Sequence, residues 1–357
     1  MGLPHRMPRA TRQKGANLND QTRHSPFSAQ DHAFMSRAIE LASRGPQADP
    51  NPRVGCVLAK DGRVLGEGWH AGAGTDHAEV AALKETGQVA GATAYVSLEP
   101  CNHTGRTGPC AQALIDAGVE RVVYAQADPN PAATGGARTL RGAGIEVAGG
   151  LLAEHAEQVN RYWTFSYLNA RPFVTWKVAA TLDGRTSALD GTSQWITGEA
   201  ARADVHIRRA SAGAIAVGTG TVMADNPRLT TRLADGSLAK RQPIRAIFGS
   251  RAIPADFNVR SPEAPTIFFS CINEGLTELT ERGVHHVWLE GGANLAASFM
   301  ARGLIDEVIC YVSASLLGAG RPLIGDLGIT TMSQIKRLHI SSVEQLDDDV
   351  RIILTPR

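Results

Sequence analysis

The fold and function open to this chain are constrained most by three side chains with the chemistry of metal ligands: His77, Cys101 and Cys110. One imidazole and two thiolates form the ligand set of a zinc site whose fourth position stays open for water. Glu79 lies two residues beyond the histidine and supplies a carboxylate that can carry a proton beside that water. Because a structural zinc site normally has a fourth protein ligand, the pattern favours a catalytic zinc. A structural clip, or three unrelated residues, is the alternative.

The composition indicates an ordinary globular protein. A chain of 357 residues is long enough for two domains, and 43% of its residues are hydrophobic and 20% charged. A net charge of +1 predicts no nucleic-acid partner, and no apolar run reaches the roughly 18 residues that a membrane span needs. An odd number of scattered cysteines favours a reducing compartment, and we expect a cytoplasmic protein. These five are Cys56, Cys101, Cys110, Cys271 and Cys310.

Residues 1–28 differ from the rest of the chain, because five basic residues stand against the single acid Asp20. The segment has no apolar core of a secretory signal, and its Arg-rich composition only weakly resembles a transit peptide. A flexible, solvated tail, or a true start at Met7, is the simpler interpretation.

Helices and strands are predicted to alternate along the first half. Apolar residues on one face predict a helix over 28–44, with Ser28 and Asp31 as a capping pair. The next expected elements are a hairpin of 54–59 and 64–69 around Asp61-Gly62, a helix over 77–86, a strand over 93–98, a helix over 110–117, strands over 121–125 and 145–148, and a helix over 154–167.

A second alternating series follows Pro172, which breaks the preceding helix. Its strands are expected over 173–179, 214–217, 244–248, 266–269, 286–289 and 308–312, and its clearest helices over 200–210 and 295–302. This alternation predicts an α/β fold with mostly parallel sheets covered on both faces. We predict a first domain over 29–170 and a second over 171–357.

Two glycine-containing turns follow predicted strands of the second half, at 218–221 and 290–292. Small residues there let backbone N–H groups approach a phosphate at the start of a helix. Each turn alone is a weak signal, and neither is the Gly-x-Gly-x-x-Gly fingerprint. Together they favour a dinucleotide site.

Longer motifs carry a family resemblance. They are residues 50–57, 77–79, 99–110 and 128–131, then Lys177, 182–186, 193–197, 225–227 and 290–292. From about residue 30 to the C-terminus the chain resembles the bifunctional riboflavin-biosynthesis deaminase–reductases, in which eight residues between the two cysteines are typical. Asn102 and Gly108 depart from the usual Ser and Pro, but neither is a ligand or the proton carrier.

The resemblance implies a cytidine-deaminase-like three-layer α/β/α domain followed by a dihydrofolate-reductase-like α/β domain. It implies deamination of 2,5-diamino-6-(5-phosphoribosylamino)pyrimidin-4-one and then NADPH-dependent reduction of the ribosyl group to ribityl. One Zn²⁺ would be held by His77, Cys101 and Cys110, with Glu79 carrying the proton. It also implies a homo-oligomer paired through the reductase domain.

The resemblance assigns the remaining site residues. NADPH contacts are expected from Ala179, Trp195, Thr197, Thr221, Asp225, Gly292, Ala293, Asn294 and Leu295, and substrate contacts from Asn51, His103, Arg106, Ser193, Arg209, Leu229, Arg232 and Glu290. Guanidinium groups suit the substrate phosphate, although Arg209 and Arg232 can equally be solvated surface charges. Glu290 is the expected proton carrier of the reductase, with helix capping as the alternative. Trp195 can equally pack in a core, and Lys177 and Asp183 can form a buried ion pair of structural or catalytic role.

Two other functions are open to this sequence. A deaminase acting on a free or nucleic-acid base needs a basic, aromatic groove, which 5% aromatic residues and a net charge of +1 disfavour. A deaminase whose second half only binds a nucleotide or partner would not need the motifs at 193–197 and 290–292.

Overall fold

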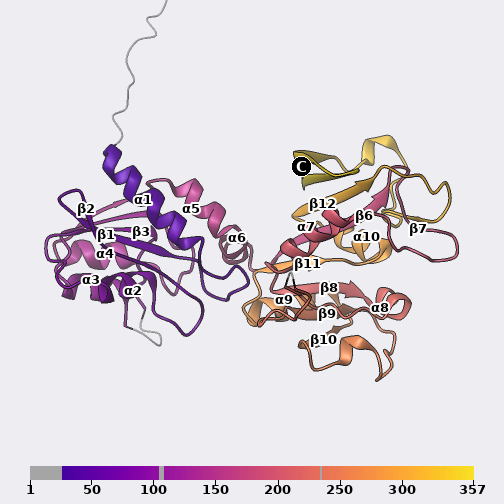
Figure 1. Cartoon of the computed structure of the whole chain (residues 1–357), viewed down its shortest axis with the longest axis horizontal. Helices are drawn as coiled ribbons and strands as arrows, with labels where there is room; N and C mark the ends of the chain where they lie inside the picture. Colours follow the sequence, from indigo (N-terminus) through magenta and orange to yellow (C-terminus); the bar gives the residue numbers. More distant parts are fainter. Residues whose placement is uncertain (1–25, 104–107, 234) are drawn as a thin grey trace, which may run out of the picture.

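The computed structural model describes residues 26–103, 108–233 and 235–357. The tail is therefore outside the described residues up to residue 25, as is Arg106. Two separate sheets, one in each half of the chain, dominate the fold (Figure 1). In the described ranges, every helix is too short or too polar to cross a lipid bilayer.

The first sheet has five strands in the order β2-β1-β3-β4-β5. Their bounds are Gly55–Lys60 (β1), Arg63–Trp69 (β2), Thr93–Leu98 (β3), Arg121–Gln126 (β4) and Glu146–Gly149 (β5). Strand β1 runs antiparallel to both β2 and β3, whereas β3, β4 and β5 are parallel. The expectation of a mostly parallel sheet is therefore wrong for this half, because the Asp61-Gly62 turn reverses the chain between β1 and β2.

Alternate side chains of these strands pack against helices on opposite faces. One face holds Val57, Tyr95 and Val123 against α1 (Ala29–Ala42) and α5 (Ala153–Val159). The other holds Leu58, Val96 and Val122 against α2 (Ala78–Lys84), α3 (Cys110–Asp116) and α4 (Gly136–Gly142). The strand period of two thus produces the expected α/β/α layers. Ser28 and Asp31 form the predicted capping box of α1.

The single helix expected over 154–167 is two helices, α5 and α6 (Arg161–Asn169). Asn160 separates them, and its side chain satisfies the Arg53 peptide: Arg53 N donates to Oδ1 at 2.8 Å, and Nδ2 donates to Arg53 O at 2.9 Å. This tertiary contact turns α6 toward the second half, where Figure 1 shows it at the junction.

The second sheet has eight strands in the order β10-β9-β8-β11-β6-β12-β15-β14. They are Phe173–Thr181 (β6), Ala214–Gly218 (β8), Ile244–Phe248 (β9), Thr266–Phe269 (β10), His286–Leu289 (β11), Glu307–Ser313 (β12), Leu338–Leu346 (β14) and Asp349–Pro356 (β15). The first six are parallel, as predicted, and β15 and β14 add an unpredicted antiparallel hairpin at one edge. Strands β7 (Arg185–Ser187) and β13 (Arg321–Pro322) form a small separate sheet.

Helices cover both faces of the second sheet. Leu276 of α9 (Ile272–Glu281) and Phe299 of α10 (Ala293–Ala301) pack with Trp176 and Leu289 on one face. The other face is covered by α7 (Glu199–Arg209) and α8 (Thr219–Asp225). Residues 218–221, expected as a turn, therefore begin the short helix α8.

Candidate active sites

Three elements of the first half bring the predicted metal ligands together. His77 is the N-cap residue of α2, Cys110 is the first residue of α3, and Cys101 follows the end of β3. His77 Nδ1 lies 3.2 Å from Cys110 Sγ and 3.6 Å from Cys101 Sγ. Within the described residues this cluster holds three donor groups, all within 4.8 Å of one another. One nitrogen and two sulfurs suit zinc with an open fourth position.

The charges of this cluster suit proton transfer. The hydrogen bond from Cys110 lowers the pKa of Cys101, whereas the same bond, together with burial, raises the pKa of Cys110. Burial, and then the negative charge of Cys101, raise the pKa of the Glu79 carboxyl to about 7. A carboxyl group in that range can both accept and donate a proton near neutral pH.

A cavity of about 140 Å³ borders the cluster, and its lining includes the predicted residues Asn51, His103, His77, Glu79 and Cys101. Asn51 Nδ2 lies 3.1 Å from His70 Nε2, while His70 Nδ1 lies 2.9 Å from Asp76 O. Because the Asp76 carbonyl only accepts, Nδ1 carries the His70 proton and Asn51 donates to Nε2. The Asn51 amide is thereby held in one orientation.

Further residues of the cavity carry no predicted role, among them His70, Asp128, Trp163 and Tyr167. Asp128 belongs to one of the resembling motifs, and burial raises the pKa of its carboxyl to about 6. Trp163 Nε1 is buried and has no hydrogen-bond partner within the described part of the chain. The Trp163 side chain nevertheless lines the cavity. Nothing in the sequence of α6 indicates this, because only the bend at Asn160 directs α6 to the cavity.

A second, open cleft of about 520 Å³ lies in the second half, beside the carboxyl ends of β6, β8 and β11. Predicted site residues that line it are Ala179, Ser193, Trp195, Thr197, Arg209, Thr221, Asp225, Leu229, Arg232, Glu290, Gly292 and Ala293. Asn294 and Leu295 do not line it, because they follow on α10 and Leu295 packs against the core. Ligands of parallel α/β sheets gather at this edge.

Glu290 is held as an ion in this cleft. Arg209 Nε donates to Oε1 at 2.9 Å and Nη2 to Oε2 at 2.6 Å, and Trp288 Nε1 donates to Oε1 at 2.6 Å. Burial acts to raise the pKa of Glu290, but the charges of Arg209 and Lys177 outweigh it and the pKa is lowered. The α10 N-cap is Gly292, with no side-chain cap. Glu290 is therefore a carboxylate paired with Arg209, and it does not cap α10.

The ion pair considered between Lys177 and Asp183 does not form. Asp183 instead accepts hydrogen bonds from Thr181 Oγ1 and from the backbone of Leu317 and Gly318. Lys177 lines the cleft, and burial lowers the pKa of its ammonium group.

Arg202 is a cleft residue that the sequence analysis missed. Its Nη1 donates to Thr197 O at 2.6 Å, and its Cζ lies 4.7 Å from the centre of the Trp195 ring. Arg202 thus holds two predicted cofactor contacts from α7. Its position near the start of an exposed helix carries no motif.

Comparisons with known proteins match each half of the chain to a family model. Residues 28–126 match the family model of the cytidine and deoxycytidylate deaminase zinc-binding region, and residues 172–352 match that of the RibD C-terminal domain. This chain belongs to the RibD family. It is therefore a bifunctional enzyme of riboflavin biosynthesis with a zinc-binding deaminase domain and a reductase domain.

Similar RibD proteins match over most of their length. Riboflavin biosynthesis protein RibD of Mycobacterium tuberculosis is 47% identical over 313 residues, covering 86% of this chain and 92% of the relative. That of Escherichia coli is 39% identical, covering 90% and 98%. The structure of Acinetobacter baumannii RibD has a TM-score of 0.85 at 41% identity, and the Thermotoga maritima deaminase/reductase 0.82 at 33%; each comparison covers 92% of this chain and 99% of the other.

Proposed function

We propose that this RibD enzyme deaminates 2,5-diamino-6-(5-phosphoribosylamino)pyrimidin-4-one and then reduces the ribosyl chain of the product with NADPH. The observation that carries the proposal is the convergence of His77, Cys101 and Cys110 beside Glu79 at a cavity. The Thermotoga maritima neighbour, a diaminohydroxyphosphoribosylaminopyrimidine deaminase/5-amino-6-(5-phosphoribosylamino)uracil reductase, supports the choice of substrates.

The deaminase residues divide the work of hydrolysis. His77, Cys101 and Cys110 would hold one Zn²⁺, which supplies a water molecule activated for attack on the ring carbon. Glu79 takes a proton from that water and delivers it to the departing amine, so that ammonia leaves and a ring carbonyl forms. Asn51 and His103 line the cavity and orient the pyrimidine. Arg106, outside the described residues, stays a predicted substrate contact.

The reductase residues bind a dinucleotide and a sugar phosphate in one cleft. Ala179, Trp195, Thr197, Thr221 and Asp225 would hold NADPH, which supplies the hydride. Ser193, Leu229 and Arg232 would contact the substrate, and the ion pair of Arg209 and Glu290 would lie beside it. Gly292 and Ala293 also line the cleft, and their small side chains leave room for the cofactor. Asn294 and Leu295 stay cofactor contacts predicted from the resemblance. We infer that Lys177, not Glu290, delivers the proton, because burial makes its ammonium group readier to release one.

The remaining features stay predictions. We place the domain boundary near residue 170, which agrees with the start of the second family match at residue 172. Pairing of two chains through the reductase domain is implied by the resemblance alone. A cytoplasmic location follows from the scattered cysteines, and the basic tail has no assigned role.

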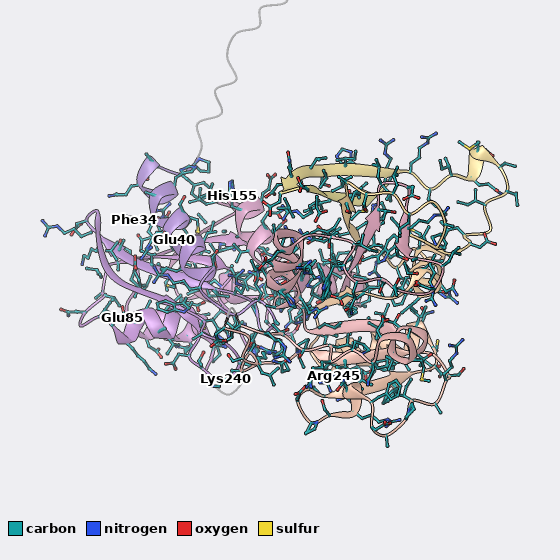
Figure 2. The ribbon with its side chains drawn as sticks, turned by 45° about the vertical axis from the view of Figure 1, so that its right-hand side comes forward. Phe34, Glu40, Glu85, His155, Lys240 and Arg245 are labelled. Atoms are coloured by element: carbon teal, nitrogen blue, oxygen red, sulfur yellow. The ribbon has the colours of Figure 1, made fainter. Side chains whose placement is uncertain are left out.

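Ammonia release tests the deaminase half directly. The wild-type enzyme should release one ammonia per substrate without NADPH, and Glu79→Gln should lower this rate about 10³-fold while keeping its zinc. Glu85→Gln is the matched control, because Glu85 is exposed at the end of the same helix, at the outer surface in Figure 2. No ammonia from wild type would refute the proposed first step.

A further inference from the structure

The loop that carries Asn51 is held from the other domain. Asp49 is 8% exposed, and its carboxylate accepts from Asn51 N at 3.0 Å and from Ala73 N at 3.2 Å. The same carboxylate accepts from Nη1 of Arg241, 2.9 Å away and 192 residues later in the chain. The Asp49 carboxylate, which holds the Asn51 loop at the deaminase cavity, is therefore paired with Arg241 of the reductase domain. In Figure 2, Lys240, the residue before Arg241, lies near the deaminase half.

His285 makes a second connection to the same cavity. Its Nε2 lies 2.9 Å from Pro50 O, and its Nδ1 lies 2.5 Å from Ser166 Oγ. Because the Pro50 carbonyl only accepts, Nε2 carries the His285 proton, and the single Ser166 hydroxyl proton is shared between His285 Nδ1 and Trp163 O, which lies 2.9 Å from Ser166 Oγ. Ser166 lies on α6 between Trp163 and Tyr167, which both line the cavity, and the Tyr167 ring lies 5.9 Å from the His285 ring. One imidazole thus joins the Pro50 loop to α6.

These contacts are poorly suited to a purely structural role. Arg241 is 54% exposed on its side chain, and the buried Asp49 carboxylate also accepts from the Asn51 and Ala73 amides, so it stays hydrogen-bonded when the ion pair is removed. The domains are joined independently by Arg161 of α6, whose guanidinium binds Glu307 of β12 at 2.7 Å. Loss of Arg241 or His285 therefore leaves the domain junction in place.

We propose that Arg241 and His285 of the reductase domain are positioning residues of the deaminase, which hold the Asp49–Asn51 loop and α6 in the geometry that binds the pyrimidine. The inference rests on the proposed deaminase function and goes beyond it, because it makes the deaminase site depend on the second domain. Neither residue lines the reductase cleft. Their effect is therefore expected in substrate binding by the deaminase and not in hydride transfer.

Steady-state deamination by the full-length zinc enzyme separates positioning from folding. Arg241→Ala and His285→Ala should each raise the deaminase KM about 10-fold and change kcat less than about twofold. A displaced Asp49–Asn51 loop or α6 weakens substrate binding but leaves the zinc ligands in place. Arg241→Lys and His285→Gln, which keep a donor, should recover part of the loss. Zinc content and reduction of the already deaminated substrate should equal wild type.

Arg282→Ala is the matched control. Arg282 lies in the same crevice between the domains and has a side chain 51% exposed, but it pairs with Glu278 of its own helix. Its deaminase KM should not change. An unchanged KM in both Arg241→Ala and His285→Ala would overturn the proposal, and so would a loss of activity that is accompanied by loss of zinc.

Amide hydrogen exchange gives a readout that does not depend on turnover. Exchange within residues 47–54 and within α6 should accelerate in Arg241→Ala and His285→Ala, but not in Arg282→Ala. Unchanged exchange would overturn the positioning role whatever the activity. If wild type releases no ammonia, the proposed function fails, whereas accelerated exchange in the variants would still support the structural connection.

Discussion

The guanidinium of Arg209 and the carboxylate of Glu290 form a two-point ion pair in the reductase cleft, with N–O distances of 2.9 and 2.6 Å. Both side chains are mostly buried, at 17% and 14% exposure. This pairing occupies the guanidinium that was expected to bind the substrate phosphate. Arg232, whose Nη1 donates to Gly236 O at 2.8 Å, is therefore the guanidinium that we expect to bind the phosphate.

Removal of Arg209 should destabilise the reductase domain strongly. Arg209→Ala leaves the Glu290 carboxylate buried without its main partner, and we expect a loss of about 3 kcal/mol in the free energy of unfolding by urea. Arg228→Ala is the control, because its pair with Glu263 is 53% exposed on the arginine side and should cost less than about 1 kcal/mol. Equal losses in the two variants would contradict the buried-pair argument.

Zinc retention should depend on the two clustered thiols. Cys101→Ser and Cys110→Ser replace a thiolate by a hydroxyl that stays protonated, so zinc affinity should fall about 10²-fold or more and deamination should be lost. Zinc content after dialysis against a weak chelator measures this. Cys271→Ser, which changes an exposed thiol, should keep its zinc. Retention of zinc by both cluster variants would exclude this site.

Cofactor affinity should depend on Arg202. Arg202→Ala removes the hydrogen bond to Thr197 O and the contact with the Trp195 ring, and the KM for NADPH should rise about 10-fold. Arg208→Ala is the control on the same helix, since Arg208 binds Asp204 and does not line the cleft. An unchanged KM in Arg202→Ala would remove Trp195 and Thr197 from the cofactor site.

Low pH should reduce the free energy of unfolding of the second domain because His286 is buried without charge. Burial lowers the pKa of this imidazole to about 3, so the unfolded chain binds a proton that the folded chain does not. Stability should therefore fall as the pH drops below about 6.5, by about 2 kcal/mol between pH 7 and pH 5. Urea unfolding at the two pH values measures the loss.

His286→Phe should remove most of this pH dependence. The substitution keeps a ring stacked on Tyr162, whose centroid lies 3.8 Å away, and removes the titrating nitrogen atoms. His155→Gln is the control, because His155 is exposed on α5 at the surface seen in Figure 2. A variant His286→Phe with the wild-type slope would show that other groups cause the acid sensitivity.

The sequence predicted the elements that carry local signals. The strand over 93–98 has the predicted limits, and the helix predicted over 110–117 begins at Cys110 as expected and ends one residue early, at Asp116, because an apolar run and a proline mark these limits. The break at Asn160 and the edge hairpin β14–β15 were missed. The first depends on a contact with Arg53, 107 residues away, and the second has a largely exposed strand and a turn at Asp347.

The sites follow the same division. His77, Glu79, Cys101 and Cys110 were predicted from residue type and spacing, since His77, Glu79 and Cys110 lie at helix starts and Cys101 follows β3. Motif resemblance placed Arg209 and Glu290 in the cleft, but their pairing was not readable from the sequence. Trp163, Arg202 and Arg241 were missed, because their contacts depend on how distant elements pack.

The absorbance of NADPH after addition of the diaminopyrimidinone ribosyl phosphate tests the central claim most directly. Wild type should oxidise NADPH only after deamination, so Glu79→Gln should fail with this substrate and recover fully with the already deaminated one. That result requires both sites and their order. Equal NADPH oxidation by wild type and Glu79→Gln on the diamino substrate, or no oxidation by wild type with either substrate, would contradict the account.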